Sequence, residues 1–338
     1  MREQHMTEIA LPGVGVGTPA IGFGCSALTG TSRGTANRIL EAAFEAGMRH
    51  FDTARYYGYG EGERILGTFL KSRRSEVTIT TKFGIEPPRR TTAVNAGLYV
   101  GRRVVRLFPF VRRFLQRGTH ALVKGGAFSA LQAQQSLETS LRELSTDHID
   151  FYLLHDYAVS EQPVDELLAF LENSVKTGKI GAFGIGSGFE NVLRALECQP
   201  HLCGVVQFQN SVLTRNRGRL SLSNSSRLVI THGALGGAYR SVLTFLEGRK
   251  DVAKDWAAKL GCDCLDKATL SALLLNYATD ANRGGLVLFS SRDPARVRQN
   301  VRAVLEPAYS PAQIALFAEL VNEKSKLIGD SPSSRRRM

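Results

Sequence analysis

The sequence predicts a (β/α)8 barrel, an α/β fold in which eight parallel strands alternate with helices. Eight short apolar runs rich in β-branched residues recur over about 270 residues, and helix-patterned stretches separate them. The runs are nearly continuous in apolar residues, as a parallel sheet that is covered on both faces requires. A doubly wound sheet would show the same alternation. The barrel is favoured because polar residues recur at the carboxyl ends of the runs, where a barrel keeps its chemistry.

The elements follow in chain order. We expect strands over residues 20–28, 50–54, 77–84, 150–156, 181–187, 205–210, 228–234 and 286–291. The residues 35–47 and 128–145 have helical periodicity. Together these elements predict a single barrel domain over 1–330, followed by a basic tail over 331–338.

Two glycine patterns resemble nucleotide-binding motifs without meeting their requirements. The stretch GVGVG (13–17) precedes the first strand and has no helix after it, so we expect a hairpin that closes the floor of the barrel. The stretch GIGSG (184–188) follows a strand but lacks the third glycine and the later acid of a dinucleotide-binding fingerprint. We expect a tight turn there as well.

The composition is that of a globular protein, with 43% hydrophobic and 22% charged residues in a chain of 338. No apolar run is long enough to span a membrane, and the first residues do not resemble a secretory signal. The five cysteines have no metal-type spacing, and their odd number favours free thiols. These features predict a soluble cytoplasmic protein without a metal site.

The formal net charge of +12 is concentrated rather than spread over the chain. Residues 86–125 hold nine Lys or Arg against one acid, Glu86, and three more arginines lie at 335–337. Because the remainder is nearly neutral, a face that binds nucleic acid is not implied.

This basic insert follows the third strand and contains a cationic amphipathic pattern. Between 98 and 118, apolar residues fall at helical spacing on one face and arginines on the other, and Pro109 should kink or divide the helix. Two interpretations stay open. The segment is either a lid or buttress whose apolar face docks on the barrel, or a helix that contacts an anionic membrane or an acidic partner.

Four polar side chains occur near the ends of neighbouring strands. Asp52, Lys82 and His155 end the second, third and fourth runs, and Tyr57 lies in the loop after the second. Since a parallel barrel brings these ends to one mouth, the four can converge. A lysine ammonium lowers the pKa of a nearby tyrosine, an aspartate holds the lysine, and a histidine can orient a substrate oxygen. The cluster therefore predicts proton transfer to a carbonyl that receives a hydride from a nicotinamide.

Six motifs occur in one order along nearly the whole chain. They are DTARYYG (52–58), TTKFG (80–84), LLHD (153–156), GIGS (184–187), QFQN (207–210) and LFSSRDPARVRQN (288–300). On these motifs the chain resembles the aldo-keto reductases, and the stretches 56–67 and 273–292 are closest to the sugar-dehydrogenase-like branch. The resemblance implies a catalytic tetrad of Asp52, Tyr57, Lys82 and His155, with Tyr57 as the acid. It also implies NADP(H) or NAD(H) bound across the barrel mouth.

The resemblance further implies which residues contact the cofactor. Ser187 and Gln207 match positions that bind the nicotinamide carboxamide, and His232 lies where the family usually stacks a tyrosine on the nicotinamide ring. The adenosine-phosphate motif is matched by Ser291, Arg296, Gln299 and Asn300; Ser290 replaces the family's usual lysine, and Arg292 follows two residues on. Because the guanidinium of Arg296 can donate two hydrogen bonds to a 2′-phosphate, we expect NADP(H), with NAD(H) as the alternative.

The expected activity is the interconversion of a carbonyl or sugar hemiacetal and its alcohol or lactone. Ser26 stands where some members of the family have a tryptophan, which implies a roomier or more polar substrate pocket, and Tyr56 is expected in the pocket wall or in packing. A cofactor-sensing or scaffold protein of low turnover is the alternative on the same barrel. A metal-dependent hydrolase is disfavoured because Lys82 and Tyr57 are poor metal ligands.

Overall fold

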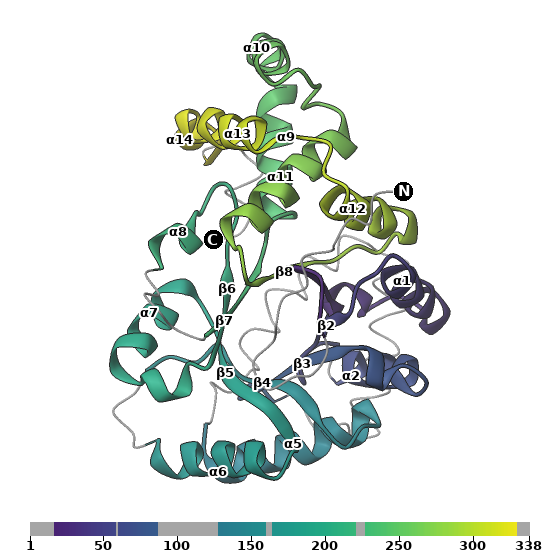
Figure 1. Ribbon diagram of the computed structural model, residues 1–338, viewed down its shortest axis with the longest axis vertical. Coiled ribbons are helices and arrows are strands. Elements are labelled where there is room, and N and C mark those ends of the chain that lie inside the picture. The colour runs from purple at the N-terminus through teal and green to yellow at the C-terminus, as the bar shows by residue number, and fades with distance from the viewer. Residues whose placement is uncertain (1–16, 59, 87–127, 160–163, 221–226, 330–338) are drawn as a thin grey trace, which may run out of the picture.

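Eight parallel strands close into a barrel in a computed structural model that describes residues 17–58, 60–86, 128–159, 164–220 and 227–329 (Figure 1). The strands are β1 (Ile21–Gly24), β2 (His50–Asp52), β3 (Thr78–Phe83), β4 (Ile149–His155), β5 (Ile180–Gly186), β6 (Val205–Gln209), β7 (Leu228–His232) and β8 (Leu286–Phe289). Each strand pairs with the next in the chain, and β1 pairs with β8 to close the sheet. The predicted (β/α)8 barrel is confirmed, and closure rules out the open doubly wound sheet.

The strands lie where the apolar runs predicted them, but several are shorter. The first run was expected to continue to residue 28, yet β1 ends at Gly24 and a 3-10 helix, η1 (Cys25–Leu28), follows. Beyond the last ladder pair the chain has to leave the sheet to form the mouth of the barrel, and apolar composition does not mark that point.

Helices cover the outside of the barrel, as Figure 1 shows for α1, α2, α5, α6 and α7. The helices are α1 (Arg33–Glu45), α2 (Glu61–Leu70), η2 (Arg74–Glu76), α5 (Ala130–Leu144), α6 (Asp165–Lys176), α7 (Phe189–Cys198), η4 (Pro200–Leu202), α8 (Asn216–Arg219), α9 (Gly237–Glu247), α10 (Lys250–Leu260), α11 (Lys267–Ala281), α12 (Pro294–Leu305), α13 (Pro311–Glu323) and α14 (Ser325–Gly329). The predicted helices 35–47 and 128–145 correspond to α1 and α5.

Side-chain caps fix where several helices begin. The hydroxyls of Ser32 and Ser129 accept hydrogen bonds from backbone N–H groups in the first turns of α1 and α5. The carboxylates of Asp266 and Asp293 do the same for α11 and α12. Three of these caps, at Ser32, Ser129 and Asp293, follow strands β1, β3 and β8, and the mouth of the barrel is built from such strand-to-helix loops.

Three apolar clusters hold the molecule together. A small cluster that includes Phe151, Leu153 and Ile230 packs inside the barrel, and the largest cluster lies mostly between strands and outer helices. The third cluster, around Trp256 and Phe317, joins α9, α10, α11, α13 and α14, which gather beyond one side of the barrel in Figure 1. This helical extension has no counterpart among the elements that we predicted.

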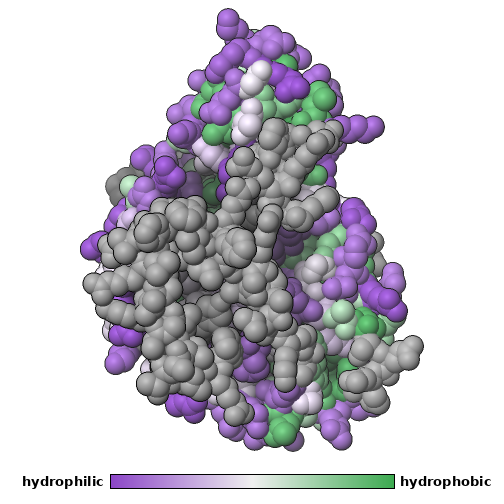
Figure 2. Space-filling model, turned by 180° about the vertical axis from the view of Figure 1, so that it is seen from behind, coloured by the Kyte–Doolittle hydropathy of each residue, from purple (hydrophilic) through white to green (hydrophobic). Residues whose placement is uncertain are grey.

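The outer surface is mainly polar over the described residues visible in Figure 2. Leu131, Val175 and Leu327 are the large hydrophobic side chains exposed in the described ranges, and they are dispersed over different helices. Within the same ranges no helix has both the length and the apolar character needed to cross a bilayer. Residues 13–16 of the expected hairpin, nearly all of the basic insert 86–125 and the tail 331–338 lie outside the described residues.

Candidate functional site

The predicted tetrad meets at the carboxyl ends of the strands. In the ladder, Asp52 of β2 pairs in register with Thr80 of β3, and His155 of β4 pairs with Gly186 of β5. All four residues of the tetrad line one cavity of about 370 Å³ in the mouth of the barrel. The cavity is lined by Gly24, Ser26, Asp52, Tyr57, Lys82, His155, Asp156, Gly186, Ser187, Gln207, His232, Gly233, Leu235, Gly236, Leu288, Phe289 and Ser290.

A buried ion pair forms the base of this cavity. The Lys82 ammonium lies 2.7 Å from each carboxylate oxygen of Asp52 and 2.9 Å from the backbone carbonyl oxygen of Thr53. Lys82 and Asp52 are each only 3% exposed. Three acceptors use all three ammonium hydrogens, so the lysine is fixed in position. Burial by itself lowers the pKa of Lys82, but Asp52 and Tyr57 outweigh it and the net effect is a raised pKa, so the lysine stays charged.

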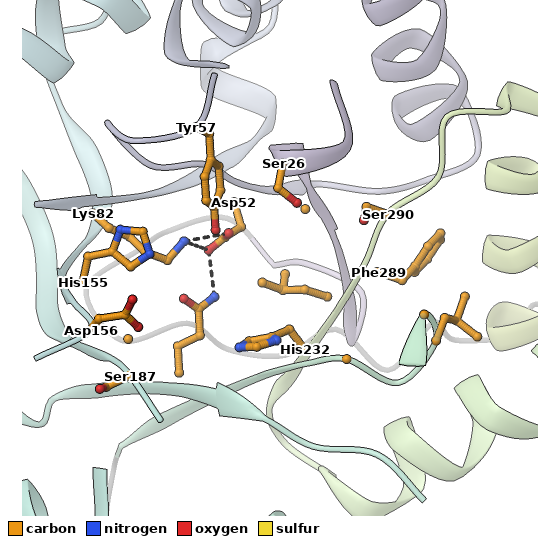
Figure 3. Close-up of a pocket in the computed structure, with 17 residues that line it drawn as sticks. Ser26, Asp52, Tyr57, Lys82, His155, Asp156, Ser187, His232, Phe289 and Ser290 are labelled. Atoms are coloured by element: carbon orange, nitrogen blue, oxygen red, sulfur yellow. Dashed lines mark hydrogen bonds and ion pairs between the residues drawn. The ribbon is translucent and has the colours of Figure 1, made fainter. Parts of the chain in front are cut away.

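Figure 3 shows Tyr57 above the ion pair and His155 beside it. The Lys82 ammonium lies 5.4 Å from the centre of the Tyr57 ring. The rings of Tyr57 and His155 lie edge to face, 6.0 Å apart at an interplanar angle of 86°. In the described structure the His155 Nδ1 atom is buried and has no hydrogen-bond partner, so this ring keeps hydrogen-bonding capacity that the protein leaves unused.

The protonation states of these two groups follow from burial. Burial raises the pKa of Tyr57 above its ordinary value; Lys82 lowers it, as the sequence suggested, but by less. The phenol therefore remains protonated at neutral pH. Burial, and next to it the charge of Lys82, lowers the pKa of His155 to about 3, so its imidazole is neutral. A protonated phenol and a neutral imidazole are two hydrogen-bonding groups that a carbonyl oxygen can use.

Gln207 lines the cavity and makes a contact with the ion pair that the sequence did not indicate. Its side-chain amide nitrogen donates a hydrogen bond of 2.8 Å to Asp52 Oδ2, so Asp52 is shared by Lys82 and Gln207. The amide oxygen of Gln207 is left as an acceptor toward the cavity. The Ser187 hydroxyl donates to the backbone carbonyl of Tyr157 at 2.8 Å, accepts from the Asn191 amide at 3.2 Å and retains one lone pair. His232 lies at the edge of the cavity, where desolvation by the surrounding protein lowers the pKa of its imidazole.

The five residues of the predicted adenosine-phosphate motif lie on α12 or just before it. Arg292 donates a hydrogen bond of 3.0 Å to the Ala27 carbonyl, which holds its guanidinium beside η1. Arg296 is 70% exposed and lies 3.6 Å from the Asp293 carboxylate. Gln299 is exposed, Ser291 is half-buried and Asn300 is buried. Both arginines are therefore at the start of α12, where partial positive charge from the helix favours an anion.

The structure separates the two predicted pocket residues and adds a third. Ser26 lines the cavity, whereas Tyr56 is half-buried in the loop after β2 and is not among the cavity-lining residues. Asp156 lines the cavity directly beside His155, although we assigned it no role. Its place in the LLHD motif, one residue beyond a strand end, was a signal that could have identified it.

Comparison with known proteins agrees with this geometry. The aldo/keto reductase family model matches residues 20–217, which is more than half of the chain. The chain belongs to the aldo/keto reductase family. The matched range includes every member of the tetrad, Ser187 and Gln207.

Individual aldo/keto reductases are similar at moderate identity. The NADP(+) aldo-keto reductase yakc of Schizosaccharomyces pombe is 27% identical over 249 residues, covering 68% of this chain and 63% of that protein. A D-threo-aldose 1-dehydrogenase from a Pseudomonas species is 30% identical over 200 residues, 55% of each chain. The predicted similarity to sugar dehydrogenases is thus confirmed, and the chain spans about three fifths of the length of these curated relatives.

A solved aldo/keto reductase structure shares the fold. The enzyme from Klebsiella pneumoniae, solved in complex with NADPH, superposes with a TM-score of 0.63 at 21% identity and covers 94% of this chain and 95% of its own. At 21% identity this similarity supports the fold alone, and it agrees with the closed barrel described above.

Proposed function

We propose that this aldo/keto reductase is an NADP(H)-dependent oxidoreductase that interconverts a small carbonyl compound or sugar hemiacetal and its alcohol or lactone. The observation that carries the proposal is the buried Asp52–Lys82 pair directly beneath a protonated Tyr57. A structural ion pair has no need of a phenol beside it in an open cavity, whereas proton transfer to a carbonyl oxygen needs all three groups.

The side chains divide the proton chemistry between them. In the reducing direction Tyr57 donates its proton to the carbonyl oxygen, and the phenolate that remains is stabilised by the Lys82 ammonium. Asp52 keeps that ammonium in place and charged. The neutral His155 hydrogen-bonds the same oxygen and orients the carbonyl. In the oxidising direction the phenolate removes the hydroxyl proton of the alcohol.

The residues around the cavity fit a nicotinamide cofactor. Gln207 presents an amide oxygen and Ser187 a hydroxyl lone pair, which suit the N–H groups of a carboxamide. His232 offers a planar, neutral ring at the cavity edge, with less area for stacking than a tyrosine. When bound, the nicotinamide supplies or accepts the hydride.

The choice of NADP(H) over NAD(H) is supported by charge. Arg292 and Arg296 bring positive charge to the start of α12, and the Arg296 guanidinium is exposed to solvent where a phosphate can reach it. The negative charge of Asp293 opposes these arginines. The lysine that the family usually has in this motif is also missing, because position 290 is a serine. The name of the S. pombe relative, which includes NADP(+), points the same way.

Replacing Tyr57 by phenylalanine tests the mechanism. Loss of the phenol oxygen should reduce turnover of aldehydes by about a hundredfold to ten-thousandfold, which is the range that general acid catalysis contributes. Binding of NADPH and NADH, measured by fluorescence titration, should stay near the parental value. Tyr309→Phe, which removes a hydroxyl bonded to Thr269 in the helical extension, is the matched control and should be active. Turnover by Tyr57→Phe at the parental rate would refute the mechanism, and cofactor affinity without turnover in the parent would favour the sensing protein.

The location and the role of the basic insert remain proposals. We expect a cytoplasmic protein whose insert at 98–118 either closes over the barrel or contacts an anionic membrane or acidic partner. Co-sedimentation with anionic liposomes, with and without residues 98–118, separates these cases. Binding that survives the deletion would end the membrane interpretation.

A further inference from the structure

Asp156 carries a carboxylate that the proposed chemistry does not use. It follows β4 immediately after His155, and Figure 3 shows its carboxylate turned toward the centre of the site. Within the described structure this carboxylate accepts no hydrogen bond and forms no ion pair, although the side chain is exposed to the cavity. An acid held in a pocket without a protein partner is available to a ligand.

The backbone holds Asp156 in an unusual conformation. Its φ angle is 53°, in the left-handed region that non-glycine residues seldom adopt. The turn is secured because the Asp156 N–H donates a hydrogen bond of 2.7 Å to the Gly186 carbonyl, continuing the β4–β5 ladder. Residues in sparsely populated conformations persist where the surrounding structure fixes them, and they cluster at ligand sites.

Among the described residues that line the cavity, Asp156 carries the one uncompensated charge. The charges of Lys82 and Asp52 cancel at 2.7 Å. The imidazoles of His155 and His232 are neutral, because burial lowers the pKa of each. Among the described lining groups, the Asp156 carboxylate is therefore the charge that a substrate meets beside the reacting oxygen.

We propose that Asp156 determines substrate class by accepting hydrogen bonds from hydroxyl groups of the substrate and by repelling substrates that carry a carboxylate. The inference rests on the proposed function and goes beyond it, since it selects polyhydroxylated carbonyl compounds over anionic ones. The hydroxyls of Ser26 and Ser290 in the same lining suit such a substrate. Apolar aldehydes gain nothing from Asp156 and serve as the reference.

Two variants remove the charge without disturbing the turn. Asp156→Asn keeps the shape and Asp156→Gly removes the side chain, and asparagine and glycine both tolerate the left-handed region. The control is Asp147→Asn. Asp147 lies just before the first residue of β4, at the opposite end of the strand from Asp156, and its side chain is 96% exposed. Thermal melts of all variants confirm folding.

The measurement is kcat/KM with NADPH for glyceraldehyde, butanal and succinic semialdehyde, expressed as ratios to butanal. The glyceraldehyde ratio should fall about tenfold in Asp156→Gly, as expected for the loss of a hydrogen bond to a charged group. The succinic semialdehyde ratio should rise several-fold in Asp156→Asn. Asp147→Asn should leave both ratios at the parental values. Opposite movement of the two ratios is a signature that a purely structural role for Asp156 would not produce.

The possible failures are distinguishable. If the parent reduces butanal and both ratios stay within twofold of parental in the two Asp156 variants, this inference is overturned and the proposed function stands. If the parent turns over none of the three aldehydes with either cofactor, the proposed function and this inference fall together.

Discussion

His50 shows how a single side chain ties the stability of the barrel to pH. It is fully buried in the barrel, where its ring nitrogens lie 2.9 Å from Thr78 Oγ1 and 3.2 Å from Thr80 Oγ1. Burial lowers the pKa of His50 to about 4, and the opposing charges of Asp52 and Lys82 are smaller influences. An unfolded chain has a histidine pKa of about 6.5, so it binds the proton first as the pH falls.

The sign of the pH effect follows from this difference. The contribution of neutral His50 to the free energy of unfolding is fully present above about pH 6.5. It decreases by about 3 kcal/mol as the pH falls to about 4. In His50→Gln the loss of unfolding free energy between pH 7 and pH 4, from urea titrations, should be smaller than in the parent by that amount. His201→Gln, at an exposed position, should keep the parental loss. Equal losses in the parent and in His50→Gln would contradict the prediction.

At the scale of elements, the contact between β5 and β6 depends on a glycine. A Cβ atom added to Gly184 would lie 1.8 Å from the Val205 carbonyl oxygen, its partner in the ladder. Gly184→Ala should therefore force the strands apart and destabilise the protein by about 1–3 kcal/mol or more. Because β5 and β6 lead to Ser187 and Gln207, NADPH affinity should fall as well.

The matched control for this substitution lies four residues away. Gly188, at the start of α7, has no atom within 4 Å of an added Cβ. Gly188→Ala should change the urea midpoint little. Equal midpoints for Gly184→Ala and the parent would show that the strands accommodate the methyl group without cost.

The strands and the tetrad could be predicted because each rests on a local signal. Apolar runs marked the eight strands, and the carboxyl ends of parallel strands share one mouth, so Asp52, Lys82 and His155 could be brought together without knowing the register. The hydrogen bond from Gln207 to Asp52 joins residues 155 positions apart and depends on register and rotamer, which no local pattern encodes. Asp156 did have a local signal, its place in the LLHD motif, but that its carboxylate has no partner among the described residues is visible only in three dimensions.

At the scale of the whole molecule, one helix links the barrel to the helical extension. Leu275 and Ala278 of α11 pack in the main cluster, while Leu270, Leu273 and Leu274 of the same helix pack around Trp256. We propose that the two clusters therefore unfold together, as the single domain predicted for 1–330 requires.

Trp256 is the single tryptophan of the chain, so its fluorescence reports on the extension alone. In urea, the fluorescence transition should coincide with the far-UV circular dichroism transition, and NADPH should move both equally, because binding at the mouth stabilises every part of one cooperative unit. Tryptophan fluorescence that changes at a lower urea concentration, and does not respond to NADPH, would show that the extension unfolds on its own.

The pairing of β1 with β8 has a consequence for the newly made protein. All four tetrad residues have been translated once residue 155 is added, but β1 gains its second neighbour only after Leu286–Phe289 have emerged from the ribosome. Until then the nascent chain contains the four tetrad residues, but the barrel that positions them is not closed. Translation must therefore pass Phe289 before the first turnover is possible.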